Sequence, residues 1–494
     1  MTRAAGPPWW LIGLLILLAF AFQGTRAIWE PDEGRYTATA LNMLESGDYV
    51  VPTLSGDTPH LTKPPVTYWA LAAGFAALGR NEWGARVPGA LAFVGTGLLV
   101  FGIGRRLCPQ KPWLPALIYA LSPAPVIGAN VVSTDVFLVF FETAAMYAFV
   151  RAWHDRPTPD RPWVRIMWVA WGLAFMTKGP PGLLPLLAVG VMLAIHDRPA
   201  LRRLFDPVGL VAFAVVAFTW FAVLVAHDPE RLKYFTEYEV YDRIFTAKHD
   251  RNAQWYGPLW VYGPMLLVGP LPWWILALVA AGGPSGAWSK FRRQLRTRDR
   301  DWLLLAWWFL LPLAVFCFSR SRLQLYVLPL FVPLSMMLAR ALANWSRLEG
   351  RRLRWIAGMT AVLLIALKGA LSYAPSDRDA REMARAIGKA IGTRDVAEIV
   401  FVTMRPFYGL HLYLDLSVAG VQVEQRRYEY SKYVAAEDLC SELEGRERNV
   451  YAMKQQKAAW FRSALLRCSG MQPELIGEFE ADDNRIALFL IGRP

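Results

Sequence analysis

Long apolar runs recur along the chain and constrain its fold more than any other feature. A helix needs about 20 apolar residues to cross the hydrocarbon core of a bilayer. Runs near that length occur at 8–22, 86–104, 113–131, 134–150, 164–177, 180–196, 207–226, 259–282, 302–318, 323–342 and 354–373. With 55% hydrophobic and 19% charged residues, the 494-residue chain has too little polar surface for a water-soluble protein. We therefore predict a polytopic α-helical membrane protein with about eleven transmembrane helices, in a range of about 11–13.

The distribution of positive charge predicts the orientation of these spans. If the N-terminus is cytoplasmic, the inner connections hold 21 Lys and Arg against 7 Asp and Glu, whereas the outer connections before residue 374 hold 12 against 14. Basic connections stay on the cytoplasmic side of a membrane. This topology accounts for the net charge of +13, so we predict no nucleic-acid partner. The protein is expected in the cell inner (plasma) membrane, with a cytoplasmic N-terminus and a periplasmic C-terminal domain.

Composition changes after the last span. We predict a transmembrane domain over 1–373, with long periplasmic loops at 23–85 and 227–258, and a periplasmic α/β domain over 374–494. Strand-like runs at 397–403, 449–453 and 485–491 alternate there with helix-like runs at 377–391 and 455–466. Cys440 and Cys468 lie in this domain, on the oxidising side of the membrane. They are expected either to form a disulfide or to be two separately buried thiols.

The first long loop opens with a short acidic motif, Trp29-Glu30-Pro31-Asp32-Glu33-Gly34-Arg35-Tyr36. Asp32 and Glu33 are suited to the first turn of a helix running to Leu44, because the helix dipole favours negative charge there. An equally open alternative is that a carboxylate at the membrane surface acts as a general base. Ionisable groups at such a depth are costly and usually functional.

The second half of the same loop places a cation on stiff backbone. Lys63 precedes Pro64 and Pro65, which favour an extended chain. The apolar segment 66–78 that follows is too short to span and is expected to lie along the membrane interface. We find no Gly-rich nucleotide loop, no zinc-type Cys/His spacing and no Ser/His/Asp order in the sequence.

Several strings together resemble the bacterial family-39 membrane glycosyltransferases, which include the lipid A aminoarabinose transferases and are distant relatives of protein O-mannosyltransferases. The strings are Glu30 to Tyr36, Met43 to Pro52, Lys63-Pro64-Pro65 with Tyr68-Trp69, Arg86-Val87-Pro88, Ser133-Thr134-Asp135, Thr177 to Pro180, Glu239 to Arg243, and Ser319 to Leu323 with Tyr326 to Pro329. They cover about residues 8–345 in order. The C-terminal domain resembles the family only in its position.

The resemblance implies a GT-C fold and a polyprenyl-phosphate-dependent glycosyltransferase. Such an enzyme takes a sugar from a polyprenyl-phosphate donor and gives it to a hydroxyl or phosphate of an envelope lipid, similar to lipid A, or of a glycan, at the outer face of the inner membrane. Its expected partners are the lipid-linked donor, the lipid or glycan acceptor and membrane lipids. The reaction needs a base for the acceptor and cations for the departing phosphate.

The same resemblance assigns catalytic carboxylates. Asp32 matches the catalytic aspartate of the family, and Glu33 is the alternative, as a second carboxylate or as a residue that starts the helix. Asp135, expected at an outer turn between two spans, is either another carboxylate of the cavity or a cap of the next helix.

Cationic and hydroxyl side chains match positions that hold the carrier phosphate. These residues are Lys63, Arg243 and Tyr326. Lys178, Arg320 and Arg322 are further candidates for contact with the phosphate or with a lipid headgroup. The alternatives are a snorkelling lysine for Lys63, a surface salt bridge with Glu239 for Arg243, and interfacial anchoring for Lys178 and the two arginines.

Two departures from the aminoarabinose transferases concern a metal and the sugar. Thr62 stands where those enzymes often carry Glu, and Val240 replaces a common His. The spacing from Asp32 to Lys63 is also one residue longer than expected. These changes argue against a bound metal and against the aminoarabinose donor. We therefore assign no metal ligand and no firm cofactor, a divalent metal stays open as an alternative, and so does the identity of the sugar.

Two other functions compete with this interpretation. A lipid-linked sugar flippase or transporter would tend to place its charges at mid-membrane, whereas here they gather at the outer mouth. A protein O-glycosyltransferase would use the same chemistry on Ser or Thr, and the loops do not separate the two acceptors.

Overall fold

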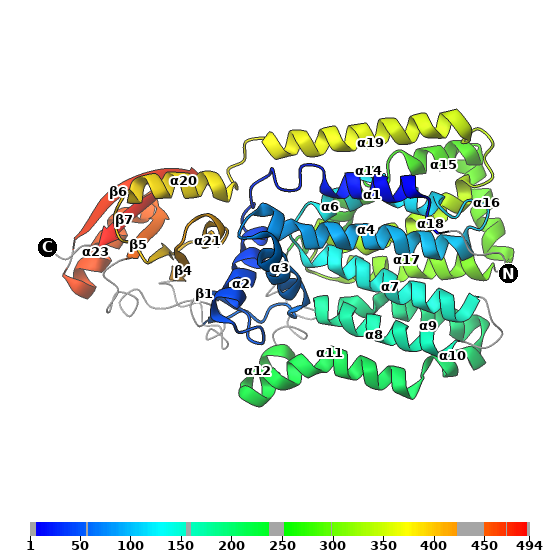
Figure 1. Ribbon diagram of the computed structural model, residues 1–494, viewed down its shortest axis with the longest axis horizontal. Helices are drawn as coiled ribbons and strands as arrows, with labels where there is room; N and C mark the ends of the chain where they lie inside the picture. The colour runs from blue at the N-terminus through cyan, green and yellow to red at the C-terminus, as the bar shows by residue number, and fades with distance from the viewer. Residues whose placement is uncertain are drawn as a thin grey trace. The chain divides into compact units, whose positions relative to one another are not determined.

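The computed structural model describes residues 6–55, 58–154, 160–236, 251–297, 299–421, 449–470 and 472–491. Most of them are helical, and all but one short hairpin of the strands lie near the C-terminal end of the chain (Figure 1). The chain divides into two compact units. The helical unit consists of Met1–Ala21 and Gly89–Gly369, and the mixed unit of Phe22–Pro88 and Ala370–Pro494.

Within the described residues, six helices are long and apolar enough to cross a membrane. They are α4 (Glu82–Leu107), α7 (Thr134–His154), α11 (Pro207–His227), α17 (Arg300–Phe318), the continuous pair η3 and α18 (Gln324–Leu342) and α19 (Gly350–Tyr373). A bent pair, α14 (Gly257–Val268) and α15 (Trp273–Ala281), adds a seventh if it counts as one span. Shorter apolar helices are α1 (Trp9–Phe20), α3 (Val66–Leu78) and η1 with α9 (Pro180–His196).

Proline interrupts two of the runs expected to be continuous. The run 113–131 forms two short helices, α5 (Leu114–Ala120) and α6 (Pro123–Ala129), with Ser122 extended between them. The run 259–282 bends by 78° where α14 gives way to α15. Proline lacks an N–H and disfavours the helical conformation of the residue before it. Among the described helices six, or seven with the bent pair, are long and apolar enough to span, so the expected number of about eleven spans stays a prediction.

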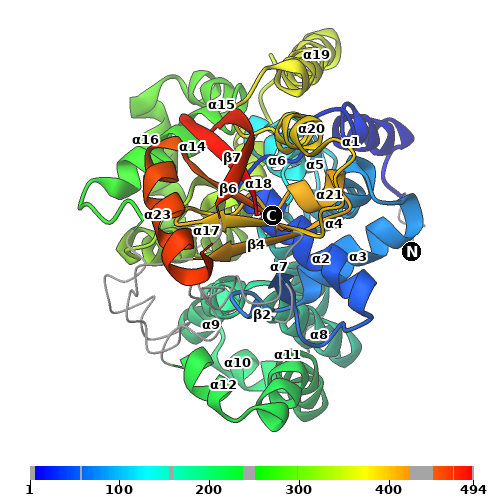
Figure 2. The ribbon, with the colours of Figure 1, turned by 90° about the vertical axis from the view of Figure 1, so that its left-hand side faces the viewer.

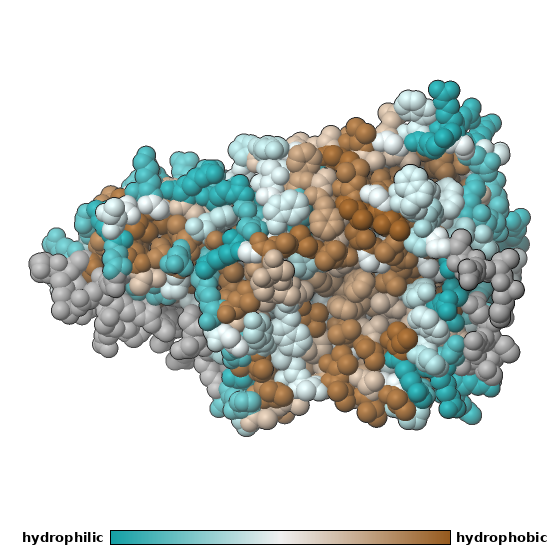
Figure 3. Space-filling model, viewed as in Figure 1, coloured by the Kyte–Doolittle hydropathy of each residue, from teal (hydrophilic) through white to brown (hydrophobic). Residues whose placement is uncertain are grey.

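Apolar side chains cover much of the outside of the helical unit. On α11 and α19 several apolar side chains are exposed rather than packed against other helices: Val208, Val211, Val215, Phe218, Trp355, Met359, Val362 and Leu363. Figure 3 shows a hydrophobic band across the helices and a hydrophilic rim at the end that carries α10 (Arg198–Leu204) and α16 (Pro284–Thr297). A contiguous apolar surface of this kind suits hydrocarbon and not water. The chain therefore has the apolar helices and the apolar surface of a multi-pass membrane protein.

The mixed unit contains a five-stranded sheet in the order β4-β3-β5-β7-β6. The strands are β3 (Glu398–Val402), β4 (Ser417–Val421), β5 (Asn449–Lys454), β6 (Pro473–Ala481) and β7 (Asn484–Ile491). β3 runs parallel to β4 and β5, and β7 runs antiparallel to β5 and β6. Figure 2 shows α20 (Ala380–Ile391) and α23 (Ala458–Ser469) on opposite sides of this sheet.

Alternation along β3 explains why helices cover both faces. Ile399 and Phe401 belong to the core that includes Ile387 of α20, whereas Val400 and Val402 belong to the core on the side of α23. Side chains of a strand point to opposite faces in turn. Because its four residues 399–402 are apolar and point to both faces, β3 needs cover on both sides.

The structure confirms the strand-like runs as β3, β5 and β7 and the helix-like runs as α20 and α23. Sequence reasoning missed β4, whose Ala419-Gly420 pair has low β-propensity, and β6, which begins with Pro473 and has a largely exposed face. Cys440 and the side chain of Cys468 lie outside the described residues. The domain boundary at 373 stays a prediction; the first long loop, Phe22–Pro88, groups with the C-terminal residues in one compact unit.

Candidate functional site

The acidic motif forms the beginning of a helix, as its sequence predicts. Helix α2 (Asp32–Ser46) starts at Asp32, with Pro31 before it and Gly47 in a left-handed conformation after its end. The side chain of Asp32 is 51% exposed and forms an ion pair with Arg35, one turn later. Asp32 is therefore a carboxylate that solvent or a substrate can reach, and a neighbouring cation on its own helix holds it.

Glu33, the next residue, is enclosed by two arginines. Arg26 donates from Nη2 to Oε1 (2.7 Å) and from Nη1 to Oε2 (2.9 Å), and Arg86 donates from Nη2 to Oε2 (3.2 Å). The backbone N–H of Trp29 also donates to Oε2 (2.8 Å). Burial alone would raise the pKa of Glu33, but the charges of Arg26 and Arg86 outweigh it and lower the pKa to about 2. These are the contacts of a structural ion pair, and a catalytic role for Glu33 stays a prediction.

The expected phosphate-binding lysine of the first loop lies just before α3. Burial lowers the pKa of the nearby His60, and the positive charges of Arg35 and Lys63 lower it further, to about 3. The imidazole of His60 is therefore neutral. Its Nε2 lies 3.0 Å from Oγ1 of Thr62. The mixed unit thus gathers the motif carboxylate, two cations and a neutral histidine. Sequence reasoning missed Arg35 and His60, although Arg35 stands three residues after Asp32, which is one helical turn.

In the helical unit, three of the expected site residues meet. Asp135 lies in the first turn of α7, Lys178 ends α8 (Arg161–Lys178), and Tyr326 belongs to η3 (Gln324–Leu330). Lys178 forms an ion pair with Asp135, and both side chains are 8% exposed. The Nζ atom of Lys178 also lies 4.1 Å from the centroid of the Tyr326 ring. The alternative role for Asp135 was a cap of this helix. Its side chain instead pairs with Lys178, and the hydroxyl of Ser133 accepts the hydrogen bond from the backbone N–H of Asp135 (3.3 Å).

A further carboxylate of α7 escaped the sequence reasoning. Glu142 is buried and stands seven residues, or two helical turns, after Asp135. The spacing alone could have indicated that both carboxylates share a face. Arg243 lies outside the described residues. Among the residues that the structure describes, no group of three or more His, Cys, Asp and Glu is arranged to hold a metal ion.

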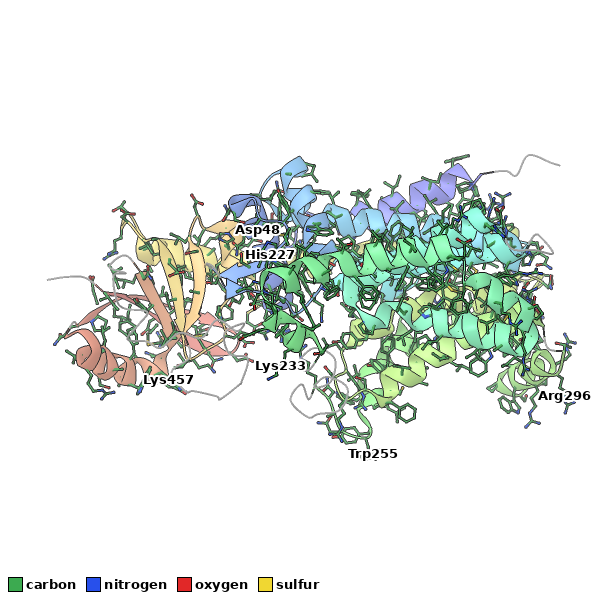
Figure 4. The ribbon with its side chains drawn as sticks, turned by 90° about the horizontal axis from the view of Figure 1, so that it is seen from below. Asp48, His227, Lys233, Trp255, Arg296 and Lys457 are labelled. Carbon is green, nitrogen blue, oxygen red and sulfur yellow. The ribbon has the colours of Figure 1, made fainter. Side chains whose placement is uncertain are left out.

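Arg322 holds the short segment 252–254, just before α14, by hydrogen bonds to its carbonyls. It donates from Nη1 to the carbonyls of Asn252 (2.6 Å) and Gln254 (3.0 Å) and from Nη2 to that of Cys317 (2.9 Å). The next side chain, that of Trp255, is 87% exposed and points away from the helices (Figure 4). Bonded to three carbonyls, Arg322 is a positioning group for this segment.

Residues 62–227 match the family model described as dolichyl-phosphate-mannose-protein mannosyltransferase. The undecaprenyl phosphate-alpha-4-amino-4-deoxy-L-arabinose arabinosyl transferase 2 of Pseudomonas fluorescens (strain ATCC BAA-477) is 35% identical over 373 residues, which are 73% of this chain and 60% of that protein. The corresponding transferase of Edwardsiella ictaluri is 30% identical over 380 residues, 74% of this chain and 66% of its own. The chain spans less than two thirds of the length of these relatives.

The crystal structure of ArnT from Cupriavidus metallidurans bound to undecaprenyl phosphate superposes with a TM-score of 0.74 at 20% identity, over 97% of each chain. A likeness at this identity concerns the fold. The chain therefore has the fold of that structure, the GT-C fold that the sequence strings imply, and it resembles the aminoarabinose transferases over nearly three quarters of its length.

The burial of Glu33 leads to a stability prediction. Glu33→Gln leaves two buried arginines without a compensating charge and should lower the free energy of unfolding by about 3–5 kcal/mol. Because the pKa of Glu33 is lowered, its contribution is full above the ordinary value of 4.5 and is lost as the pH falls toward about 2. Chemical denaturation of the detergent-solubilised protein measures both effects.

The matched control is Glu382→Gln, which removes a carboxylate from an exposed pair with Arg385 on α20. It should change the free energy of unfolding by less than about 1 kcal/mol. Equal losses of unfolding free energy in the two variants would show that the buried Glu33 stabilises the protein no more than an exposed ion pair does.

Proposed function

We propose that this chain is a membrane glycosyltransferase that moves a sugar from a polyprenyl-phosphate donor to a hydroxyl or phosphate of an envelope lipid similar to lipid A. The observation that carries the proposal is its similarity to named undecaprenyl-phosphate-dependent arabinosyl transferases across 73–74% of the chain. The residues of the site support the same chemistry, since a reachable carboxylate and several cations are what transfer from a lipid phosphate needs.

Asp32 is the proposed general base. As the acceptor oxygen attacks the anomeric carbon, its proton passes to the carboxylate, and the bond between that carbon and the phosphate oxygen breaks with its electron pair leaving on the phosphate. Exposure fits Asp32 to this role, because its side chain is 51% exposed, whereas that of its neighbour Glu33 is only 4% exposed. Arg35 donates a charge-assisted hydrogen bond to one oxygen of this carboxylate and so directs it.

Lys63, Lys178, Arg243 and Tyr326 are proposed to hold the carrier phosphate. In the helical unit the Lys178 ammonium is already neutralised by Asp135 and lies over the Tyr326 ring. A dianionic phosphate would compete with Asp135 for that ammonium. The proposal therefore gives Asp135 the part of a counter-ion that keeps Lys178 in place before the donor arrives.

We also propose the orientation and the span count expected from the sequence, about eleven spans with the N-terminus cytoplasmic and residues 374–494 periplasmic. The acidic motif then faces the periplasm, where a lipid-linked donor presents its sugar.

A protein acceptor is the second candidate function, because the matching family model is described as a protein mannosyltransferase. Glycoprotein staining of the periplasmic fraction separates the two acceptors. A glycoprotein band that disappears on deletion of the gene would favour the protein acceptor, and an unchanged pattern would favour the lipid.

Substitution of Asp32 tests its role as the base. Asp32→Asn keeps the shape of the side chain and removes the base, so transfer should fall by about 10²–10⁴-fold. The measurement is mass spectrometry of total envelope lipids with and without the protein, where transfer appears as a one-sugar mass difference. The control is Asp483→Asn, an exposed aspartate at a positive-φ position that Asn tolerates. Full transfer by Asp32→Asn would remove Asp32 from the mechanism.

Lys63 is predicted to act in donor binding. Lys63→Gln removes one charge-assisted bond to phosphate and should raise the apparent KM for the lipid-linked donor by about 10-fold or more. The control is Lys457→Gln, an exposed lysine near the start of α23 (Figure 4). The same KM in both variants would contradict the role of Lys63.

The orientation is tested by single cysteines in a background whose four native cysteines are replaced by serine. A membrane-impermeant maleimide should label Lys457→Cys in spheroplasts but label Arg296→Cys, on the basic helix α16, only after lysis (Figure 4). The reverse pattern would overturn the proposed topology.

A further inference from the structure

The backbone around the acidic motif is bound by residues that lie some 350 positions later in the chain. Within the mixed unit, the N–H of Glu30 donates to the carbonyl of Arg378 (3.0 Å), and the N–H of Ala380 donates to the carbonyl of Ile28 (3.1 Å). The N–H of Ile28 donates to the hydroxyl of Tyr413 (2.9 Å). The motif therefore owes part of its conformation to the C-terminal residues.

One side chain of the motif is buried at this junction. Glu30 is 4% exposed, and its Oε1 accepts a hydrogen bond from the backbone N–H of Gly409. Its Oε2 is buried and has no hydrogen-bond partner among the residues that the structure describes. A buried carboxyl in such a position is costly unless its place in the structure is needed.

Two glycines make room for this carboxyl. A Cβ atom on Gly34 would stand 2.5 Å from both oxygens of Glu30, and one on Gly409 would stand 2.6 Å from Oε1. Neither position can carry a larger residue without displacing the carboxyl or the backbone. The first glycine belongs to α2 and the second to the segment before α21 (Leu410–Tyr413), so Glu30 fits between these two elements.

The charged groups around Glu30 come from the same two elements. Burial raises the pKa of Glu30 to about 8, against the Gly409 hydrogen bond and the positive charges of Arg405 and Arg35, and Glu33 raises it further. Burial likewise raises the pKa of Tyr408 to about 12. At neutral pH the carboxyl of Glu30 is therefore mostly protonated, and it ionises as the pH passes through about 8.

Glu30 stands two residues before Asp32, and Arg35 joins the two carboxyls electrostatically, because it pairs with Asp32 and also acts on Glu30. We propose that Glu30 is a positioning residue, through which the segment around Gly409 holds the first turn of α2 and directs the Asp32 carboxylate. This inference rests on the proposed function, in which Asp32 is the base. A packing role alone would affect only the stability of the unit.

Ionisation gives the positioning role a direction in pH. The folded-state pKa of Glu30 is raised above 4.5, so its contribution to stability is full below that value and is lost as the pH rises through about 8. Above that pH a buried charge weakens the junction. Transfer should therefore decline on the alkaline side, in a limb that depends on Glu30.

The experiment combines transfer kinetics with hydrogen exchange of the full-length protein in detergent. Glu30→Ala removes the acceptor of the Gly409 N–H, so a peptide covering 405–413 should exchange faster, and kcat should fall by about 10–100-fold with the donor KM within about twofold. Glu30→Gln keeps the acceptor and cannot ionise, so it should retain kcat near pH 7 and lose the alkaline limb. The control, Glu480→Gln on an exposed position of β6, should change neither readout.

Gly409→Ala provides a second route if Glu30→Ala does not fold, because its Cβ should push the carboxyl aside and reproduce the loss of kcat. Unchanged kcat and exchange in Glu30→Ala, or an alkaline limb that persists in Glu30→Gln, would overturn the positioning role. Failure of the proposed function is a separate result: wild-type protein would then show no transfer, while faster exchange at 405–413 in Glu30→Ala would still report the junction.

Discussion

A carboxylate buried between two arginines holds the acidic motif in place, and the candidate site depends on it. Glu33 accepts from Arg26, Arg86 and the backbone of Trp29 at once. Breaking one partner of such a group leaves an uncompensated charge away from water, which costs far more than an exposed pair is worth. The chain before α2, the first turn of α2 and the start of α4 are thereby tied to one point.

With Glu33 enclosed, the motif separates three carboxyls by their surroundings. Among the described residues, Oε2 of Glu30 is buried without a partner, Glu33 is buried and ionised, and Asp32 reaches the surface beside Arg35. Neighbouring acids whose environments differ this much are suited to different tasks. The proposed chemistry uses this difference, since a base must be ionised and reachable while its supports must not move.

In the helical unit, a buried cation and a buried carboxylate lie together at the ends of apolar helices. Lys178 and Asp135 neutralise each other at the ends of α8 and α7, and the Tyr326 ring covers the ammonium. Charges at such positions are rare and are usually paired. The pairing keeps a cation available at the end of the apolar helices without leaving a lone charge between them.

Local and periodic patterns carried much of the prediction. Apolar runs indicated the helices of the membrane domain, alternation indicated β3, β5 and β7, and the acidic turn indicated the start of α2. Prolines in the sequence mark the breaks within two of the apolar runs, but the predicted spans continue across them. Strand β4 was missed because its Ala419-Gly420 pair has low β-propensity, and β6 because it begins with Pro473 and has a largely exposed face; their neighbours in the sheet hold both.

The sequence by itself determined the helical membrane class of the protein and which residues are candidates for the site, because hydrophobic length, charge and short motifs are local properties. Only the tertiary structure decided which of those residues are reachable. Exposure of Asp32, enclosure of Glu33 and the meeting of Lys178 with Asp135 and Tyr326 depend on contacts between distant segments. The same holds for Glu30, whose carboxyl accepts a hydrogen bond from the backbone N–H of Gly409, 379 residues away along the chain.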